Sequence, residues 1–146
     1  PMGKRGLGPR RPSNYGRNGG TSYREHANKN LFVSVQIETT DALDQVDQIA
    51  DIRGVDSLVV GPSDLAASLG ITGQLDAPEL KKAIRKISES AHRAGIHVGA
   101  GMDADVDFAL NLRELGVDWV QCGCDFSYLI RCVDQLYGQI RQKIHG

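Results

Sequence analysis

The stretch that decides the fold runs from Phe32 to Leu65 and reads FVSVQIETTDALDQVDQIADIRGVDSLVVGPSDL. It holds two short apolar segments separated by a helix-like segment, and each apolar segment leads to a carboxylate, Glu38 and Asp64 respectively. A strand, a helix and a second strand over this length form one crossover unit, whose two strands are parallel. Neighbouring parallel strands lie ~5 Å apart, so we expect the two carboxylates to meet at one edge of a sheet. Such a pair of oxygen ligands suits a hard divalent cation that keeps open positions for water and substrate.

Polar and apolar side chains alternate along the first of these segments. The alternation predicts a strand over residues 32–38 with an apolar face of Val33, Val35 and Ile37 and a polar face of Ser34, Gln36 and Glu38. In an ordinary surface strand the polar face points to water. In a closed parallel barrel the polar face points into the barrel mouth and helices cover the apolar face.

The strand–helix pattern repeats to the end of the chain. Further strands are expected at residues 57–64, 96–101 and 117–124, and helices at residues 41–51, 76–95, 103–115 and 126–144. This alternation predicts an α/β fold with a parallel sheet. A doubly wound sheet would carry a glycine-rich turn after its first strand, and Glu38-Thr39-Thr40 is not one. The pattern therefore favours a (β/α)8 TIM-barrel type, which needs ~250 residues, so this chain would supply about half of a barrel.

Composition argues against nucleic acid and membranes as partners. The 146 residues are 40% hydrophobic and 24% charged with a net charge of −1, so there is no basic excess to bind nucleic acid or an anionic membrane. No apolar run reaches the ~20 residues of a membrane span. The three cysteines, Cys122, Cys124 and Cys132, form neither an even disulfide set nor a paired zinc spacing. We therefore expect a cytoplasmic protein with reduced thiols, in which Cys122 and Cys124 are small core residues.

The first 30 residues differ in composition from the rest. Up to residue 20 they are rich in glycine and carry only basic charges, at Lys4, Arg5, Arg10, Arg11 and Arg17. A phosphate-binding loop would lead into a helix whose amides face the anion, whereas this segment leads toward a strand. We therefore expect an irregular lead-in segment over residues 1–30 and a barrel domain over residues 31–146. Because the chain does not begin with methionine, we expect it to be cut from a longer protein.

The two strand-end motifs, Val35-Gln36-Ile37-Glu38 and Gly61-Pro62-Ser63-Asp64-Leu65, resemble those of the HpcH/HpaI family of metal-dependent pyruvate aldolases. The resemblance extends over almost the whole chain and includes the opening residues 1–6, Gly-Val-Asp at 54–56 and Gly-x-Asp at 123–125. It implies that the chain is the C-terminal half of a TIM-barrel aldolase domain and supplies about the last four βα units.

The resemblance also implies roles for particular residues. Glu38 and Asp64 match the two carboxylate ligands of a divalent metal cation, Mg²⁺ or Mn²⁺, with Co²⁺ as a further option. Gln36 matches the substrate-binding glutamine, and Ser63 and Asp64 match positions whose backbone amides hold the pyruvate carboxylate. The implied activity is that of a carbon–carbon lyase, which reversibly cleaves a small-molecule 2-oxo acid to pyruvate and an aldehyde. Pro62 fits this arrangement because it lacks an N–H and fixes the turn before the two amides.

The acid–base residues of the family are not found in this chain. In the family, a histidine base and an arginine lie on early strands, and both positions fall upstream of residue 1. None of His26, His92, His97 and His145 replaces the base, since His97 begins a strand and the others lie on helices or ends. We therefore expect no catalytic residue in this chain and little metal binding or turnover by the chain alone.

Other interpretations remain open at this point. Asp64 could cap a short helix after the turn, and Glu38 could be a solvated residue at a strand end. The protein could instead decarboxylate oxaloacetate or cleave an acyl-CoA with related chemistry, or it could be a non-catalytic half-barrel. The last predicted helix carries an apolar stripe, and the family exchanges a C-terminal helix between subunits. This implies a homo-oligomer, of which a hexamer with exchanged helices is one form.

Overall fold

The computed structural model describes residues 11–18 and 22–145. Contacts within the chain divide it into two units, Pro1–Phe32 and Val33–Gly146, each of which is described by itself. The described part of the first unit contains a 3-10 helix, η1 (Arg11–Ser13), and the helix α1 (Tyr23–Asn30). We expected an irregular segment here, but α1 carries Glu25 in its first turn and Lys29 in its last, charges that stabilise the two ends of a helix. The opening motif of residues 1–6 and the basic residues Lys4, Arg5 and Arg10 lie outside the described residues.

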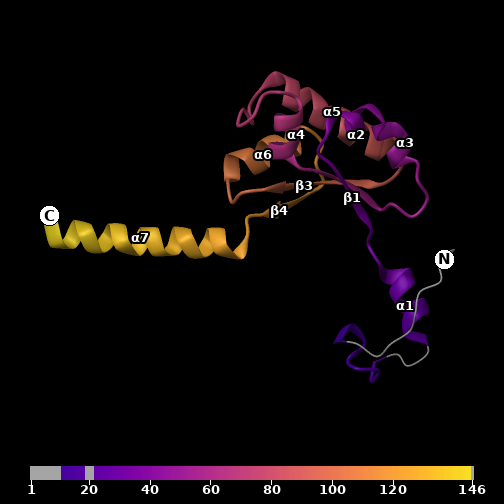
Figure 1. Cartoon of the computed structure of the whole chain (residues 1–146), viewed down its shortest axis with the longest axis horizontal. Helices are drawn as coiled ribbons and strands as arrows, with labels where there is room; N and C mark the ends of the chain where they lie inside the picture. The colour runs from indigo at the N-terminus through magenta and orange to yellow at the C-terminus, as the bar shows by residue number, and fades with distance from the viewer. Residues whose placement is uncertain (1–10, 19–21, 146) are drawn as a thin grey trace. The chain divides into compact units, whose positions relative to one another are not determined.

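The second unit is built on a parallel sheet of four strands in sequence order (Figure 1). The strands are β1 (Ser34–Ile37), β2 (Ser57–Val60), β3 (His97–Met102) and β4 (Trp119–Cys122). Each strand pairs in parallel with the one that follows it in sequence, for example Ile37 with Val60 and Val60 with Ala100. The prediction of a parallel α/β sheet is confirmed.

Helices cover one face of this sheet. They are α2 (Thr40–Asp44), α3 (Val46–Ala50), α4 (Pro62–Ser68), α5 (Pro78–Arg93) and α6 (Val106–Glu114), and they lie along one side of the strands in Figure 1. The buried core forms between the apolar strand face and a stripe of α5 residues at three- and four-residue spacing, Leu80, Ala83, Ile84, Ile87 and Ala91. Full burial of an aliphatic side chain stabilises a fold by ~1.5–3 kcal/mol, so this layer holds the sheet together.

Two details of the helices differ from expectation. The helix expected over 41–51 is interrupted at Gln45, whose φ of −101° and ψ of 10° separate α2 from α3. The helix expected from residue 76 begins at Pro78 with Ala77 at its N-cap, and the Asp76 carboxylate lies 3.5 Å from the Nζ atom of Lys81. In both regions the buried apolar residues still recur at helical spacing, as Leu43, Val46 and Ala50 do in the first, because tertiary packing depends on the spacing of apolar residues more than on caps.

The face of the sheet opposite the helices carries one large aromatic residue. The Trp119 indole Nε1 donates a hydrogen bond to the Ser57 hydroxyl at 3.2 Å, so the side chain reaches from β4 across β3 to β2. Gly99 of β3 lies beneath it, and a Cβ atom added at Gly99 would be only 2.2 Å from the indole. A glycine at position 99 is therefore required for Trp119 to occupy this place.

Two aspartates join neighbouring strands at the amino end of the sheet. Asp56 precedes β2, and its carboxylate accepts a hydrogen bond from the Val33 N–H at 2.7 Å, while its own N–H donates to the Val33 carbonyl at 2.8 Å. Asp118 precedes β4 and makes the same two bonds to Val98, each of 2.8 Å. Each aspartate follows a Gly-Val pair whose glycine, Gly54 or Gly116, has a positive φ. We refer to these two arrangements as the aspartate clasps.

The clasp of Asp118 should make stability depend on acidic pH. Burial raises the pKa of Asp118, but the Val98 N–H and the His92 side chain, together with the charges of His92 and His97, outweigh it and hold the pKa below its ordinary value. A lowered pKa means that the carboxylate stabilises the fold above the pH at which an unfolded aspartate titrates, ~3.9, and that this contribution disappears as pH falls through the folded-state value.

We therefore expect Asp118→Asn to lower the free energy of unfolding at pH 7 by less than about 1 kcal/mol, because the side chain is partly exposed and solvent screens its charges. The difference from the unsubstituted chain should shrink below about pH 4. Urea unfolding at pH 7 and pH 3 measures both values, with the exposed Asp44→Asn as the control. A difference that grows on acidification would contradict this assignment.

The last helix, α7 (Asp125–His145), has no buried residue. Its apolar residues are exposed along its length: Phe126, Tyr128, Leu129, Ile130, Val133, Leu136, Tyr137, Ile140 and Ile144. Within the described ranges, no helix combines the length and apolar character of a membrane span. The cysteines Cys122, Cys124 and Cys132 are also exposed and unpaired. The prediction that Cys122 and Cys124 lie in the core was therefore wrong, because the core ends before the last residues of β4.

Candidate active site

The first part of the candidate site forms where β1 and β2 end. Gln36 and the half-buried Glu38 lie on the strand face opposite the buried Ile37, as the alternation predicted. Both side chains lie against Gly61, the residue that follows β2. A Cβ atom added at Gly61 would be 3.0 Å from Gln36 Nε2 and 3.2 Å from Glu38 Oε2. The structure thus brings Gln36 and Glu38 together over a backbone that only glycine leaves open.

Ser63 and Asp64 occupy the turn that continues from Gly61. Helix α4 begins at Pro62, with Gly61 as its N-cap and no side-chain capping bond. Asp64 therefore lies inside the first turn, and the alternative that Asp64 caps the helix is wrong. The Leu65 N–H makes the first intrahelical bond, to the Gly61 carbonyl at 2.8 Å. Because N–H groups in the first turn have no partner within the helix, the amides of Ser63 and Asp64 are able to bind an acceptor outside it.

The two carboxylates at this edge have no partner in the part of the chain that the structure describes. Neither Glu38 nor Asp64 makes a hydrogen bond or ion pair there, whereas Asp56 and Asp118 at the amino end of the sheet do. The described residues also contain no group of three or more His, Cys, Asp or Glu side chains able to hold a metal ion. Two free carboxylates fit a hard divalent cation whose other ligands are water and substrate oxygens.

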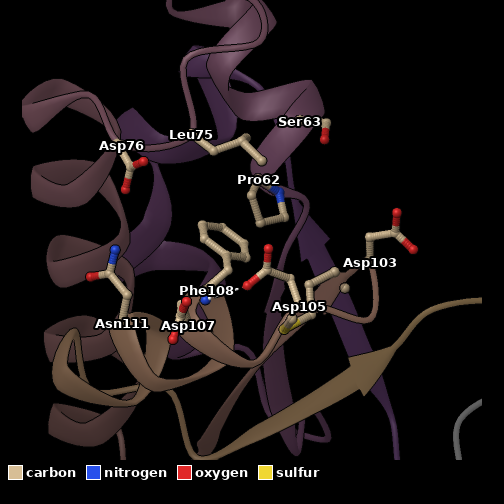
Figure 2. Close-up of a pocket in the computed structure, with 11 residues that line it drawn as sticks. Pro62, Ser63, Leu75, Asp76, Asp103, Asp105, Asp107, Phe108 and Asn111 are labelled. Carbon is tan, nitrogen blue, oxygen red and sulfur yellow. Dashed lines mark hydrogen bonds between the residues drawn. The ribbon is translucent and has the colours of Figure 1, made fainter.

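A cavity of about 490 Å³ adjoins the same turn (Figure 2). It lies between the start of α4, the loop before α5, the end of β3 and α6, and its lining includes Pro62, Ser63, Met102, Phe108 and Asn111. This cavity was not predicted from the sequence. The signal that could have indicated it is the run of aspartates after the third strand, at positions 103, 105 and 107.

Four aspartates also line this cavity, and most of them already have partners. Asp76 pairs with Lys81, Asp103 lies 3.7 Å from Arg131, and Asp105 accepts a hydrogen bond from the Phe108 N–H at 2.9 Å. Asp105 is the N-cap of α6. The aspartates of the cavity therefore serve mainly to hold the loops around it.

The histidines of the second unit do not reach this edge. His97 is the first residue of β3, and His92 lies in the last turn of α5. Both contact Asp118 at the amino end of the strands, His92 Nε2 at 3.2 Å and His97 Nδ1 at 3.8 Å. His145 is the last residue of α7, and His26 belongs to the first unit. The expectation that His97 lies at the edge away from the carboxylates agrees with the strand register.

A comparison with protein families then identifies the chain. The model of the HpcH/HpaI aldolase/citrate lyase family matches residues 3–132. The chain belongs to this family. The match includes both strand-end motifs on which the resemblance was based.

Individual members of the family support the same assignment. Hydroxypyruvate/pyruvate aldolase of Pseudomonas aeruginosa is 33% identical over 141 residues, which cover 97% of this chain and 52% of that protein. 4-hydroxy-2-oxo-heptane-1,7-dioate aldolase of Shigella sonnei is 36% identical over 138 residues, covering 93% and 52% of the two chains. The crystal structure of an HpcH/HpaI aldolase/citrate lyase family protein from Burkholderia cenocepacia J2315 has a TM-score of 0.83 and 35% identity, covering 97% of this chain and 54% of that one.

The chain thus spans about half the length of the relatives it matches. Its four strands form one arc of the family's TIM-barrel type fold, and the predicted fold class is confirmed. The arc contains the carboxyl ends of four strands. Barrels of this type carry their active sites at that edge.

Proposed function

We propose that this chain is part of a cytoplasmic carbon–carbon lyase that reversibly cleaves a 2-oxo acid to pyruvate and an aldehyde with the help of a divalent metal ion. The observation that carries the proposal is the position of Gln36 and Glu38 against Gly61, where the turn to Ser63 and Asp64 begins. The names of the aldolases that the chain is similar to support the same class of reaction.

Each residue of the site has a separate role in this proposal. The carboxylates of Glu38 and Asp64 hold the ion, Mg²⁺ or Mn²⁺ with Co²⁺ as a third option. The amides of Ser63 and Asp64 bind the carboxylate of pyruvate, and the Gln36 side chain donates a hydrogen bond to the substrate. A divalent ion at this place supplies Lewis-acid stabilisation of the negative charge that develops as the carbon–carbon bond breaks. No proton transfer is assigned to the described residues, since no histidine of the second unit's sheet lies at this edge.

The function is tested with the gene product that contains this chain. We expect it to release pyruvate from a 4-hydroxy-2-oxo acid, to lose this activity on treatment with a chelator and to regain it when Mn²⁺ or Mg²⁺ is added. Activity that persists at full rate after chelation and dialysis would contradict the proposal.

Gln36 provides a test of the substrate role that is independent of the metal. Gln36→Leu removes a hydrogen bond to a charged substrate, an interaction worth about 1.5–3 kcal/mol, so we expect kcat/KM for the 2-oxo acid to fall by about 10–150-fold. Metal affinity should stay within about twofold of the unsubstituted protein, because Gln36 is not a proposed ligand. Equal losses of metal affinity and kcat/KM would show that Gln36 acts through the metal site instead.

A second candidate function follows from the family's description, which includes citrate lyase as well as aldolase. The same site could serve decarboxylation of oxaloacetate or cleavage of an acyl-CoA, since each needs stabilisation of a similar developing charge. Parallel assays of oxaloacetate decarboxylation and aldol cleavage separate these activities. A preparation with neither activity, in the presence of metal, would favour a non-catalytic role.

The exposed apolar stripe of α7 supports a homo-oligomer as part of this proposal, with a hexamer that exchanges its C-terminal helices as one form. A contiguous apolar surface of this kind is typical of an interface between proteins. Sedimentation of a chain that ends before α7 tests the contact, and a truncated chain that assembles fully would contradict it.

A further inference from the structure

The segment Cys122-Gly123-Cys124 joins the last strand to the last helix and carries two free, exposed thiols. Cys122 is the final residue of β4, and Cys124 directly precedes α7. The Gly123 N–H donates to the Met102 carbonyl of β3 at 2.7 Å, which is the last bond between this segment and the sheet. The two thiols therefore lie on either side of the point where the chain leaves the sheet.

The backbone at Gly123 turns between the two cysteines. Gly123 has a φ of +66°, the left-handed conformation that glycine adopts most readily. Even a fully extended chain separates residues two apart by at most about 7 Å between Cα atoms, and a left-handed residue between them shortens this distance. A disulfide requires Cα atoms about 4.4–6.8 Å apart, so Cys122 and Cys124 lie within bridging range.

The third cysteine is too far away to compete. Cys132 lies eight residues beyond Cys124 along α7, and at 1.5 Å per helical residue the two are separated by about 12 Å. Bridging to Cys132 would require the first turns of α7 to unwind. Cys132 is also exposed, so it offers a matched control for thiol reactivity.

We propose that Cys122 and Cys124 are a reversible thiol–disulfide modification site whose oxidant is a low-molecular-weight disulfide such as oxidised glutathione. One cysteine thiolate attacks a sulfur of the small disulfide, and a mixed disulfide forms as one small thiolate leaves. The second cysteine thiolate attacks the protein sulfur of the mixed disulfide and releases the second small thiolate. The two cysteines lose two electrons and two protons, and the small disulfide becomes two thiols.

The bridge would act on the joint between β4 and α7. The Tyr128 hydroxyl, in the first turns of α7, donates to the Cys122 carbonyl at 2.6 Å, and the Tyr128 N–H donates to the Cys124 carbonyl at 3.2 Å. Closing a ring over Gly123 would restrict the backbone between these two bonds. A ring with one intervening residue is strained, so the bridge is readily reduced again by thiols.

The experiment treats the reduced full chain with oxidised glutathione under native conditions, labels remaining thiols with iodoacetamide and digests the product with trypsin. Cleavage after Arg113 and Arg131 yields one fragment, 114–131, that holds Cys122 and Cys124, while Cys132 falls in the next fragment. We expect fragment 114–131 to be unlabelled and about 2 Da lighter than its reduced form. Cys132 should still take the label, and dithiothreitol should restore two labels to fragment 114–131.

Three variants sharpen the result. Cys132→Ser should form the same bridge, whereas Cys124→Ser should retain glutathione on Cys122, seen as a gain of about 305 Da. Gly123→Ala disfavours the left-handed turn and should lower the ratio of bridged to glutathione-bound fragment several-fold. The proposal is overturned if fragment 114–131 carries two iodoacetamide labels or two glutathione adducts, or if the bridge forms to Cys132 or to a second chain.

Discussion

Glu38→Gln and Asp64→Asn, made in the gene product that contains this chain, should each weaken Mn²⁺ binding by more than about 100-fold and reduce aldol cleavage by at least as much. Loss of a group that only orients a ligand already costs about 10–100-fold in metal affinity, and removal of a charged ligand should cost more. Both substitutions keep the size of the side chain, so Gln at position 38 still fits against Gly61. Titration of bound Mn²⁺ by electron paramagnetic resonance, alongside pyruvate release, measures the two effects.

The matched control is Glu89→Gln, which neutralises an exposed carboxylate in the middle of α5. It should leave metal affinity and activity unchanged. The free energy of unfolding of all three variants, measured in urea, should equal that of the unsubstituted protein within about 0.5 kcal/mol. None of the substituted carboxylates has a described partner. If Glu38→Gln and Asp64→Asn bind Mn²⁺ normally, the metal site lies elsewhere.

The second large effect is expected at Gly99. Gly99→Ala would place a methyl group 2.2–2.7 Å from the indole of Trp119, and the indole is held by its hydrogen bond to Ser57. Overpacking of this kind costs about 1–3 kcal/mol, and the upper end applies because Trp119 is fixed at both ends. We expect the free energy of unfolding in urea to fall by this amount.

Gly101, two residues further along β3, is the matched control. A Cβ atom added there has no neighbour within 4 Å, so Gly101→Ala should be neutral or slightly stabilising. In a Trp119→Leu background, Gly99→Ala should lose most of its effect, because the indole that it displaces is gone. An equal cost of Gly99→Ala in both backgrounds would show that the close approach of Trp119 and Gly99 does not limit stability.

The helices and strands were predictable because the spacing of apolar residues along the sequence is enough to indicate them. The apolar stripe of α5 and the two faces of β1 follow from periods of about 3.6 and 2 residues. The α5 stripe is buried, and on β1 Ile37 is buried while Val35, and Val33 just before the strand, are half-buried. The break at Gln45 was not predictable, since one residue in a distorted conformation leaves the apolar spacing of Leu43, Val46 and Ala50 unchanged. The exposure of Cys122 and Cys124 was missed for a related reason: strand alternation does not reveal where the covering helices end.

The candidate site was predictable only in part. The pairing of two parallel strands placed Glu38 and the turn to Asp64 at one edge, because a crossover unit leaves no other arrangement. The contact of Gln36 and Glu38 with Gly61, and the reach of Trp119 to Ser57, depend on side-chain directions across two or three strands. No local pattern encodes such contacts, and the structure was needed to find them.

Each aspartate clasp fixes the position of one strand, β2 or β4, against the strand that precedes it in the sheet. The same number of residues separates Asp56 from Gly61 and Asp118 from Gly123, so each glycine follows its clasp by the same length of strand. A residue inserted between Asp56 and Gly61 would turn the following side chains of β2 to the other face of the sheet, and Gln36 and Glu38 would then lie against a different neighbour. The alignment of β2 and β4 is thus set at the amino edge of the sheet, although the candidate site lies at the carboxyl edge.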